Sequence, residues 1–216
     1  MKKILLLALP LLAVCFASCE KDNGNNGELS GDDIIQFEDA NFLQALLTVQ
    51  EIELYDADRN EYEYYLVDVD TNRDGQISVN EAQNVRGLGL INYETYEPFN
   101  VQSMPEIKYF TALEYLECHR NLLTSLDVSN NTALEYLECG YNQLTSLDVS
   151  KNTALAYLYC YENQLTSLDV SNNTALEYLE CGYNHLETLT ISESHQNTVW
   201  LNNVKYEYPG IKIIVK

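Results

Sequence analysis

The sequence predicts a solenoid of the α/β type that is dominated by β-structure, with a parallel sheet along a right-handed coil and a small helical cap before it. The main observation is a period of 21 residues through the second half of the 216-residue chain, because a fixed period in this range is typical of solenoids. A polar segment before the repeats and apolar runs after them predict caps for the two ends of the coil.

The chain is strongly acidic. Its 12 Lys and Arg stand against 33 Asp and Glu, which gives a formal net charge of -21. Affinity for phosphate backbones comes from clustered basic side chains, and the only such cluster is at the extreme N-terminus. We therefore expect no nucleic-acid partner.

Residues 1–18 have the features of an export signal. Two lysines, Lys2 and Lys3, precede an apolar stretch over 4–18 that is too short to span a bilayer. The run Phe16-Ala17-Ser18-Cys19 resembles the lipobox of bacterial lipoproteins, which implies that Cys19 becomes the lipidated first residue. An ordinary signal peptide cut nearby is the alternative.

Residues 19–33 are polar and rich in Gly and Asn, so we expect a flexible tether. The acidic residues after Cys19 resemble the surface-export signal of Bacteroidetes-type lipoproteins. This resemblance implies an exported protein that is anchored to the outer membrane and faces the cell surface. Without Lys2 and Lys3 the formal charge becomes 10 − 33 = −23, so contact with an anionic membrane is expected only through the lipid.

Residues 34–84 are expected to form a helical, EF-hand-like cap. Apolar residues over 39–47 fall on one helical face, and residues 70–81 match the EF-hand calcium loop at each diagnostic position, with Gly75 at the sharp bend. A capping box formed by Ser78 and Glu81 for a helix over 79–85 is the competing interpretation. The segment 56–60 begins like a second loop but lacks the bend and the last ligand, so we interpret it as degenerate. The predicted cofactor is Ca²⁺, and its expected oxygen donors are Asp70, Asn72, Asp74, Gln76 through its carbonyl, Ser78 and Glu81.

The repeats extend over residues 85–193, and their regular 21-residue units begin at about residue 113. One unit reads Leu-x-x-Leu-x-Cys-x-x-Asn-x-Leu-x-x-Leu-Asp-Val-Ser-x-Asn from residue 134. It resembles the leucine-rich repeat. We expect Leu and Cys to point inward from short stacked strands, and the repeated Asn of each unit to bond backbone groups inside the coil. One Cys per coil favours core packing over metal binding or disulfides. The four cysteines are Cys118, Cys139, Cys160 and Cys181.

Degenerate units are expected at both ends of the repeats. Residues 85–90 have the pattern of a first strand, and residues 194–216 are expected to form a C-terminal cap. Within this cap, 198–203 and 210–215 are predicted to be strands that cover the last coil.

The outward residues of the predicted sheet form columns of Tyr and Glu. Tyrosine is favoured at interfaces, and stacked Glu side chains repel one another unless a cation lies over them. We interpret the face as a binding surface for a protein with a basic patch; a glycan is the second candidate ligand, and tolerated copies of good strand formers are the alternative. His119 is expected to be an exposed residue of this face. The face consists of Tyr115, Glu117, Tyr136, Glu138, Tyr157, Tyr159, Tyr161, Tyr178 and Glu180.

As a whole, the chain resembles surface leucine-rich-repeat lipoproteins of Bacteroidetes-type bacteria, internalin-like in organisation and with an EF-hand segment before the repeats. The resemblance implies extracellular protein recognition or adhesion, and a glycan-binding accessory lipoprotein is the rival. The Cys at the strand position and an insertion over 91–101 depart from the pattern. No G-x-S-x-G or H-E-x-x-H motif occurs and the histidines are scattered, so we do not expect an enzyme.

Overall fold

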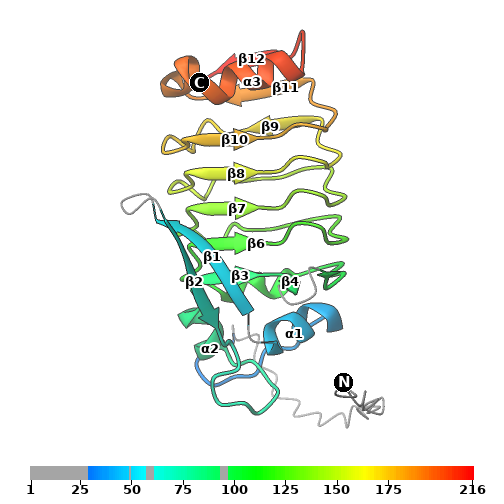
Figure 1. Cartoon of the computed structure of the whole chain (residues 1–216), viewed down its shortest axis with the longest axis vertical. Helices are drawn as coiled ribbons and strands as arrows, with labels where there is room; N and C mark the ends of the chain where they lie inside the picture. The colour runs from blue at the N-terminus through cyan, green and yellow to red at the C-terminus, as the bar shows by residue number, and fades with distance from the viewer. Residues whose placement is uncertain (1–28, 49, 57–60, 93–96) are drawn as a thin grey trace, which may run out of the picture.

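The computed structural model describes residues 29–48, 50–56, 61–92 and 97–216 (Figure 1). The predicted signal segment, Cys19, the tether up to residue 28 and most of the degenerate loop at 56–60 lie outside the described residues. Among the helices that are described, none has the length and apolar character needed to cross a membrane.

The repeats form a stack of coils with one parallel sheet along one side (Figure 1). Its strands are β3 (Gly87–Gly89), β6 (Tyr115–Glu117), β7 (Tyr136–Glu138), β8 (Tyr157–Tyr159) and β10 (Tyr178–Glu180), in the order β10-β8-β7-β6-β3. Equivalent residues of successive coils are paired in register. The fold is therefore a β-dominated leucine-rich-repeat coil, and the degenerate first strand within 85–90 belongs to it through β3.

A second parallel sheet closes the C-terminal end of the coil. It contains β9 (Ser167–Asp169), β11 (Thr188–Ile191) and β12 (Lys212–Val215), in the order β12-β11-β9. The strand predicted over 210–215 is confirmed by β12. The strand predicted over 198–203 is wrong, because this segment lies in helix α3 (Val199–Glu207), which follows the 3-10 helix η2 (Glu193–Asn197). The helix buries Trp200, Leu201 and Val204, a spacing that brings all three to one helical face.

The interior is filled as the repeat pattern predicts. The repeat Leu side chains and all four repeat cysteines are buried, and these cysteines are free thiols. Two ladders of buried Asn run along the coil. The predicted ladder starts at Asn121, and a second one at Asn131, Asn152 and Asn173 donates to backbone carbonyls of the preceding coil.

The N-terminal cap is only partly helical. Helix α1 (Ala40–Leu47) begins at Asp39, whose side chain accepts from the Asn41 N–H, and helix α2 (Val79–Asn84) follows the predicted calcium loop. Between them, β1 (Gln50–Asp56) and β2 (Glu61–Val67) form an antiparallel hairpin that the sequence analysis did not predict. The hairpin lies beside β3, at the N-terminal end of the main sheet (Figure 1).

Short elements connect the cap to the first regular repeat. Strands β4 (Ile91–Asn92) and β5 (Glu97–Pro98) pair as a small antiparallel ribbon within the insertion, and the 3-10 helix η1 (Pro105–Tyr109) follows. Glu106 of η1 is buried and accepts from the Glu38 N–H at 2.9 Å. This bond ties the start of the cap to the coil.

Candidate functional site

The Tyr columns on the main sheet are produced by its register. Tyr115, Tyr136, Tyr157 and Tyr178 are paired across neighbouring strands, so their side chains lie on the same face. The rings of Tyr115 and Tyr136 are stacked with centroids 4.3 Å apart, and those of Tyr159 and Tyr178 lie 5.0 Å apart.

The tyrosines hold the Glu column in place. In three coils the hydroxyl of the first strand residue donates to the carboxylate two residues later: Tyr115 to Glu117 at 3.3 Å, Tyr136 to Glu138 at 2.9 Å and Tyr178 to Glu180 at 3.3 Å. Burial and the nearby carboxylates raise the pKa of each of these tyrosines. The hydroxyls therefore stay protonated and remain donors.

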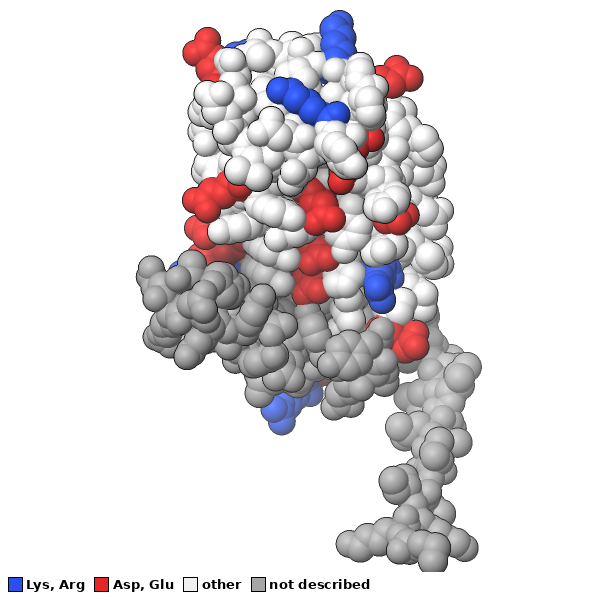
Figure 2. All heavy atoms as spheres, turned by 45° about the horizontal axis from the view of Figure 1, so that its top comes forward, with Lys and Arg blue, Asp and Glu red and all other residues white. Residues whose placement is uncertain are grey.

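The face is more open towards its C-terminal end. Glu117 is only 8% exposed, whereas Tyr157 and Tyr178 are 37% and 38% exposed. Figure 2 shows acidic side chains along the middle of the face in view, with the visible basic side chains nearer its margins. The accessible part of the predicted surface is therefore its C-terminal half.

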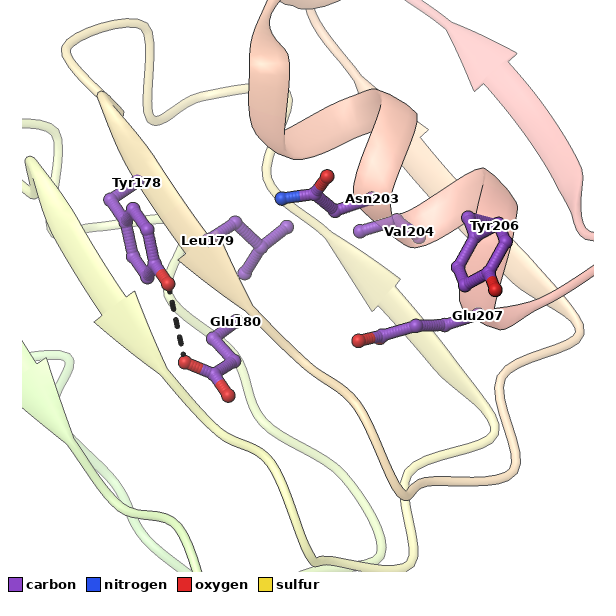
Figure 3. A pocket seen from close by; sticks show the side chains of 7 residues that line it. All are labelled: Tyr178, Leu179, Glu180, Asn203, Val204, Tyr206 and Glu207. Atoms are coloured by element: carbon purple, nitrogen blue, oxygen red, sulfur yellow. Dashed lines mark hydrogen bonds between the residues drawn. The ribbon is translucent and has the colours of Figure 1, made fainter.

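A hollow of about 210 Å³ lies where this half of the face meets helix α3 (Figure 3). Tyr178 and Glu180 of β10 line one side, and Tyr206 and Glu207 of α3 line the other. Burial, followed by the charge of Glu180, raises the pKa of Glu207. The hollow thus combines two like-charged carboxylates with two aromatic rings, which is a suitable environment for a cationic group. This hollow was not predicted, because a strand was expected over 198–203, where α3 lies.

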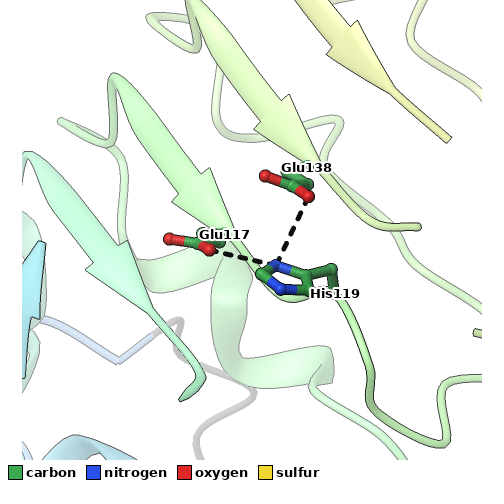
Figure 4. A group of neighbouring side chains, drawn as sticks. All are labelled: Glu117, His119 and Glu138. Atoms are coloured by element: carbon green, nitrogen blue, oxygen red, sulfur yellow. Dashed lines mark ion pairs between the residues drawn. The ribbon is translucent and has the colours of Figure 1, made fainter. Parts of the chain in front are cut away.

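A second cluster joins two neighbouring coils near the other end of the face (Figure 4). His119 Nδ1 lies 3.0 Å from Glu117 Oε1 and 3.5 Å from Glu138 Oε1. The side chains of Glu117, His119 and Glu138 are only 10%, 15% and 16% exposed. The expectation that His119 is an exposed face residue is therefore wrong, because the carboxylates of Glu117 on β6 and Glu138 on β7 both lie against its Nδ1.

The predicted calcium loop has the turn structure that an EF-hand loop needs. Asp70 accepts from the N–H groups of Asp74 and Gly75, and Asn72 accepts from Asp74. Gly75 has a φ of +80°, a conformation that favours glycine. These bonds curl the backbone of residues 70–76 and fix the side-chain oxygens at loop positions 1, 3 and 5.

Glu81 connects the two ends of this loop. Its Oε2 accepts from the N–H and hydroxyl of Ser78, which completes the capping box of α2, and its Oε1 accepts from the N–H and hydroxyl of Thr71 at 3.0 Å. Partial burial would raise the pKa of Glu81, but the bonds from Ser78 and Thr71 outweigh it and lower the pKa. Asp70, Asp74 and Glu81 do not bring three carboxylate oxygens within 4.8 Å of one another. The donor set fits Ca²⁺ in type and order, and Glu81 would have to exchange its bonds to Thr71 and Ser78 for the ion.

The cysteine ladder has no feature of a reactive site. Burial, together with the charge of Glu138, raises the pKa of Cys139 to about 12, and burial also raises the pKa of Cys118 well above its ordinary value. Such thiols are inert as nucleophiles and as metal ligands at neutral pH. Their role is to pack the core.

Comparisons with known proteins find similar solved structures but no matching family. No protein-family model and no curated protein matches the chain. Among solved structures, the chain is similar to the functional domain of InlJ from Listeria monocytogenes, which includes a cysteine ladder, at 37% identity over 54% of this chain and 27% of that chain, with a TM-score of 0.47. It is also similar to the internalin InlF from Listeria monocytogenes, at 22% identity over 71% of this chain and 49% of that chain, with a TM-score of 0.44.

A third similar structure is the leucine-rich-repeat protein LIC12759 from Leptospira interrogans, at 20% identity over 62% of this chain and 38% of that chain, with a TM-score of 0.38. The chain spans less than half of the length of each of these three proteins. The class of the protein, a leucine-rich-repeat solenoid, therefore follows from its own coils and registers.

Proposed function

We propose that the protein is a cell-surface recognition module that binds a protein partner with the C-terminal half of its Tyr/Glu face. The hollow between β10 and α3 carries this proposal. It places Glu180 and Glu207 beside Tyr178 and Tyr206, and neither carboxylate is paired with a Lys or Arg among the residues that the structure describes.

The chemistry of the hollow selects a basic side chain. Burial and, after it, the charge of Glu180 raise the pKa of Glu207. A Lys or Arg of the partner would relieve the repulsion between the two carboxylates, and its aliphatic stem would contact the tyrosine rings. Tyrosine anchors and a desolvated charge at the centre of a face are common features of the strongest positions in interfaces. Tyr157 and Tyr159 extend the same surface along the sheet.

The proposal is tested by selecting peptides from a random display library against the whole protein. The matched control is the Glu180→Gln, Glu207→Gln double variant, which keeps the shape of the hollow and removes its charge. We expect selected sequences to be rich in Lys and Arg and to lose binding to the control. A glycan array run in parallel assigns the face to carbohydrate instead if a glycan binds the protein but not a Tyr178→Ala variant.

We further propose that residues 70–81 bind a structural Ca²⁺. Asp70, Asn72, Asp74, Ser78 and Glu81 would supply side-chain oxygens and Gln76 its carbonyl. Calorimetric titration of the whole protein with Ca²⁺ tests this, with Glu81→Gln as the disabled variant. Asp68→Asn, just outside the loop, is the matched control, since it removes a carboxylate that pairs only with Arg73 at the surface. Equal heats for the protein and Glu81→Gln would reduce the segment to a capped turn.

The anchor is proposed on the sequence of residues 16–19. A lipid on Cys19 would attach the recognition module to the outer membrane, with the acidic tether placing it at the cell surface. Substitution Cys19→Ala should release the protein from the membrane fraction, and unchanged fractionation would contradict the proposal.

A further inference from the structure

The cluster of Glu117, His119 and Glu138 has the composition and spacing of a small metal centre. Each of the three residues offers a ligand atom within 4.8 Å of the others. Among the described residues, no other group of His, Cys, Asp and Glu meets this condition. We infer that Glu117, His119 and Glu138 bind a divalent transition-metal ion of the Zn²⁺ type, held between two coils of the solenoid.

The distances agree with tetrahedral coordination. Bonds of about 2.0 to 2.2 Å place neighbouring ligand atoms of a tetrahedral zinc site roughly 3.3 to 3.6 Å apart. Here His119 Nδ1 lies 3.0 Å from Glu117 Oε1 and 3.5 Å from Glu138 Oε1. These two separations differ from the tetrahedral range by at most a few tenths of an ångström, and the third pair of ligand atoms lies within 4.8 Å.

The state of the imidazole nitrogen is the second observation. Within the part of the chain that the structure describes, the buried His119 Nδ1 makes no hydrogen bond, and its contacts with the oxygens of Glu117 and Glu138 are ion pairs. A buried nitrogen in an ordinary structural role is hydrogen-bonded. A metal ion among the three residues would take a lone pair from this nitrogen and from an oxygen of each carboxylate.

An outer shell of tyrosines is already in place. Tyr136 donates to Glu138 Oε2 at 2.9 Å and Tyr161 donates to Glu138 Oε1 at 3.1 Å, while Tyr115 donates to Glu117 Oε2. Hydrogen bonds of this kind orient the ligating carboxylates of metal sites. The one nitrogen and two oxygens favour zinc or a similar first-row ion over calcium, which prefers six to eight oxygens.

The site is accessible and free of thiolates. The exposed fraction of each of the three side chains is 10 to 16%, so an ion can enter and keep water as its fourth ligand. Cys118, between Glu117 and His119 in the sequence, points into the core and its pKa is raised well above the ordinary value. It is therefore not a ligand.

The test is a zinc titration of the whole protein against a chromogenic chelator, in saturating Ca²⁺ so that residues 70–81 do not take up zinc. The disabled variants are His119→Gln and Glu138→Gln. The matched controls are His185→Gln, which removes an exposed histidine, and Glu135→Gln, which removes an exposed carboxylate near Glu138.

We expect the unsubstituted protein to bind one more zinc ion than His119→Gln, with both controls unchanged. The dissociation constant should rise at least about 100-fold in the disabled variants, since even loss of an outer-shell partner costs roughly 10 to 100-fold. Tyr161→Phe, which keeps all three ligands, should raise it by about 10-fold. Equal zinc binding by the protein and His119→Gln would overturn the inference.

Two further readouts keep the test decisive. If His119→Gln does not fold, as judged by circular dichroism, the Tyr161→Phe variant carries the comparison, and an unchanged dissociation constant there overturns the inference. The Co²⁺-loaded protein should show d–d absorption without a thiolate charge-transfer band. A thiolate band would place the ion on cysteine and refute the assignment. None of these readouts depends on the proposed protein partner.

Discussion

Substitution Asn142→Ala tests the physical role of the asparagine ladder in a central coil. The Asn142 Oδ1 accepts from the Leu123 N–H at 3.0 Å, and its Nδ2 donates to the carbonyls of Cys118, Cys139 and Gly140 at 3.0, 3.1 and 3.2 Å. One side chain therefore joins two coils through four hydrogen bonds. Alanine removes all of them.

The magnitude follows from which partners are left without a bond. Each of the three carbonyls keeps a second donor, so each loses only a weak shared bond, about 0.5 kcal/mol at the lower end of the net value. Among the described residues, the Leu123 N–H has only the Asn142 oxygen as a partner, and an unsatisfied buried N–H costs about 1 to 3 kcal/mol. The expected loss of unfolding free energy is about 2.5 to 4.5 kcal/mol. The remaining donors are Asn121 to Cys118, Asn163 to Cys139 and Arg120 to Gly140.

The assay is urea unfolding followed by circular dichroism and by the fluorescence of Trp200, which is buried in the C-terminal cap. Asn130→Ala is the matched control, because Asn130 is an exposed asparagine of a nearby corner, and it should change the free energy by less than about 0.5 kcal/mol. If Asn142→Ala were as stable as Asn130→Ala, the ladder would not be the source of stability that its hydrogen bonds indicate.

Three other predictions follow from the same structure. Gly140→Ala should destabilise the protein by about 1 to 3 kcal/mol in urea unfolding, because its Cβ would lie 2.8 Å from the Tyr161 ring. Gly182→Ala is the control: its Cβ would meet the end of the Glu207 side chain at 3.0 Å, and the loss of stability should be smaller. The four ladder cysteines should not react with Ellman's reagent at pH 8 until the protein is denatured, since they are buried and their pKa values are raised; rapid reaction of four thiols in the native state would contradict this. Burial raises the pKa of Glu106, so the folded state binds this proton more tightly than the unfolded state, and the contribution of Glu106 to stability falls as pH rises above the ordinary Glu range. In thermal unfolding, Glu106→Gln should therefore stabilise the protein at pH 7 but not at pH 4. An equal effect at both pH values would refute the reasoning.

The repeats were predictable because each coil repeats one set of physical requirements. Cys139 occupies a buried Leu position and Asn142 a position where the turning backbone needs partners, so their spacing alone defined the inner wall. The caps lack this redundancy. The helix over Val199–Glu207 forms because Trp200 and Val204 must cover the last coil from one face, and the stretch is too short for its period to be distinguished from that of a strand.

The sequence of the hairpin β1–β2 contains a pattern that is typical of strands. Acidic residues alternate with apolar or aromatic residues over 51–54 and again over 61–64, which is the period of two that indicates a strand. The interpretation of 56–60 as a degenerate calcium loop separates these two runs in the sequence. Two alternating runs joined by a short polar segment are more typical of a hairpin.

Departures from the repeat identify the positions where the face is specialised. The third outward column reads His119, Gly140, Tyr161 and Gly182, and a position that served only the fold would have the same requirement in every coil. Gly140 leaves the space that the Tyr161 ring occupies, and this lets the Tyr161 hydroxyl reach back to Glu138, the carboxylate beside His119. Three consecutive departures thus converge on one carboxylate. These residues come from three coils, so they lie close together only because the coils stack in register. No motif within a single coil indicates their proximity. Residues that differ between coils are therefore the better guide to function in this solenoid, and those that repeat are the better guide to its fold.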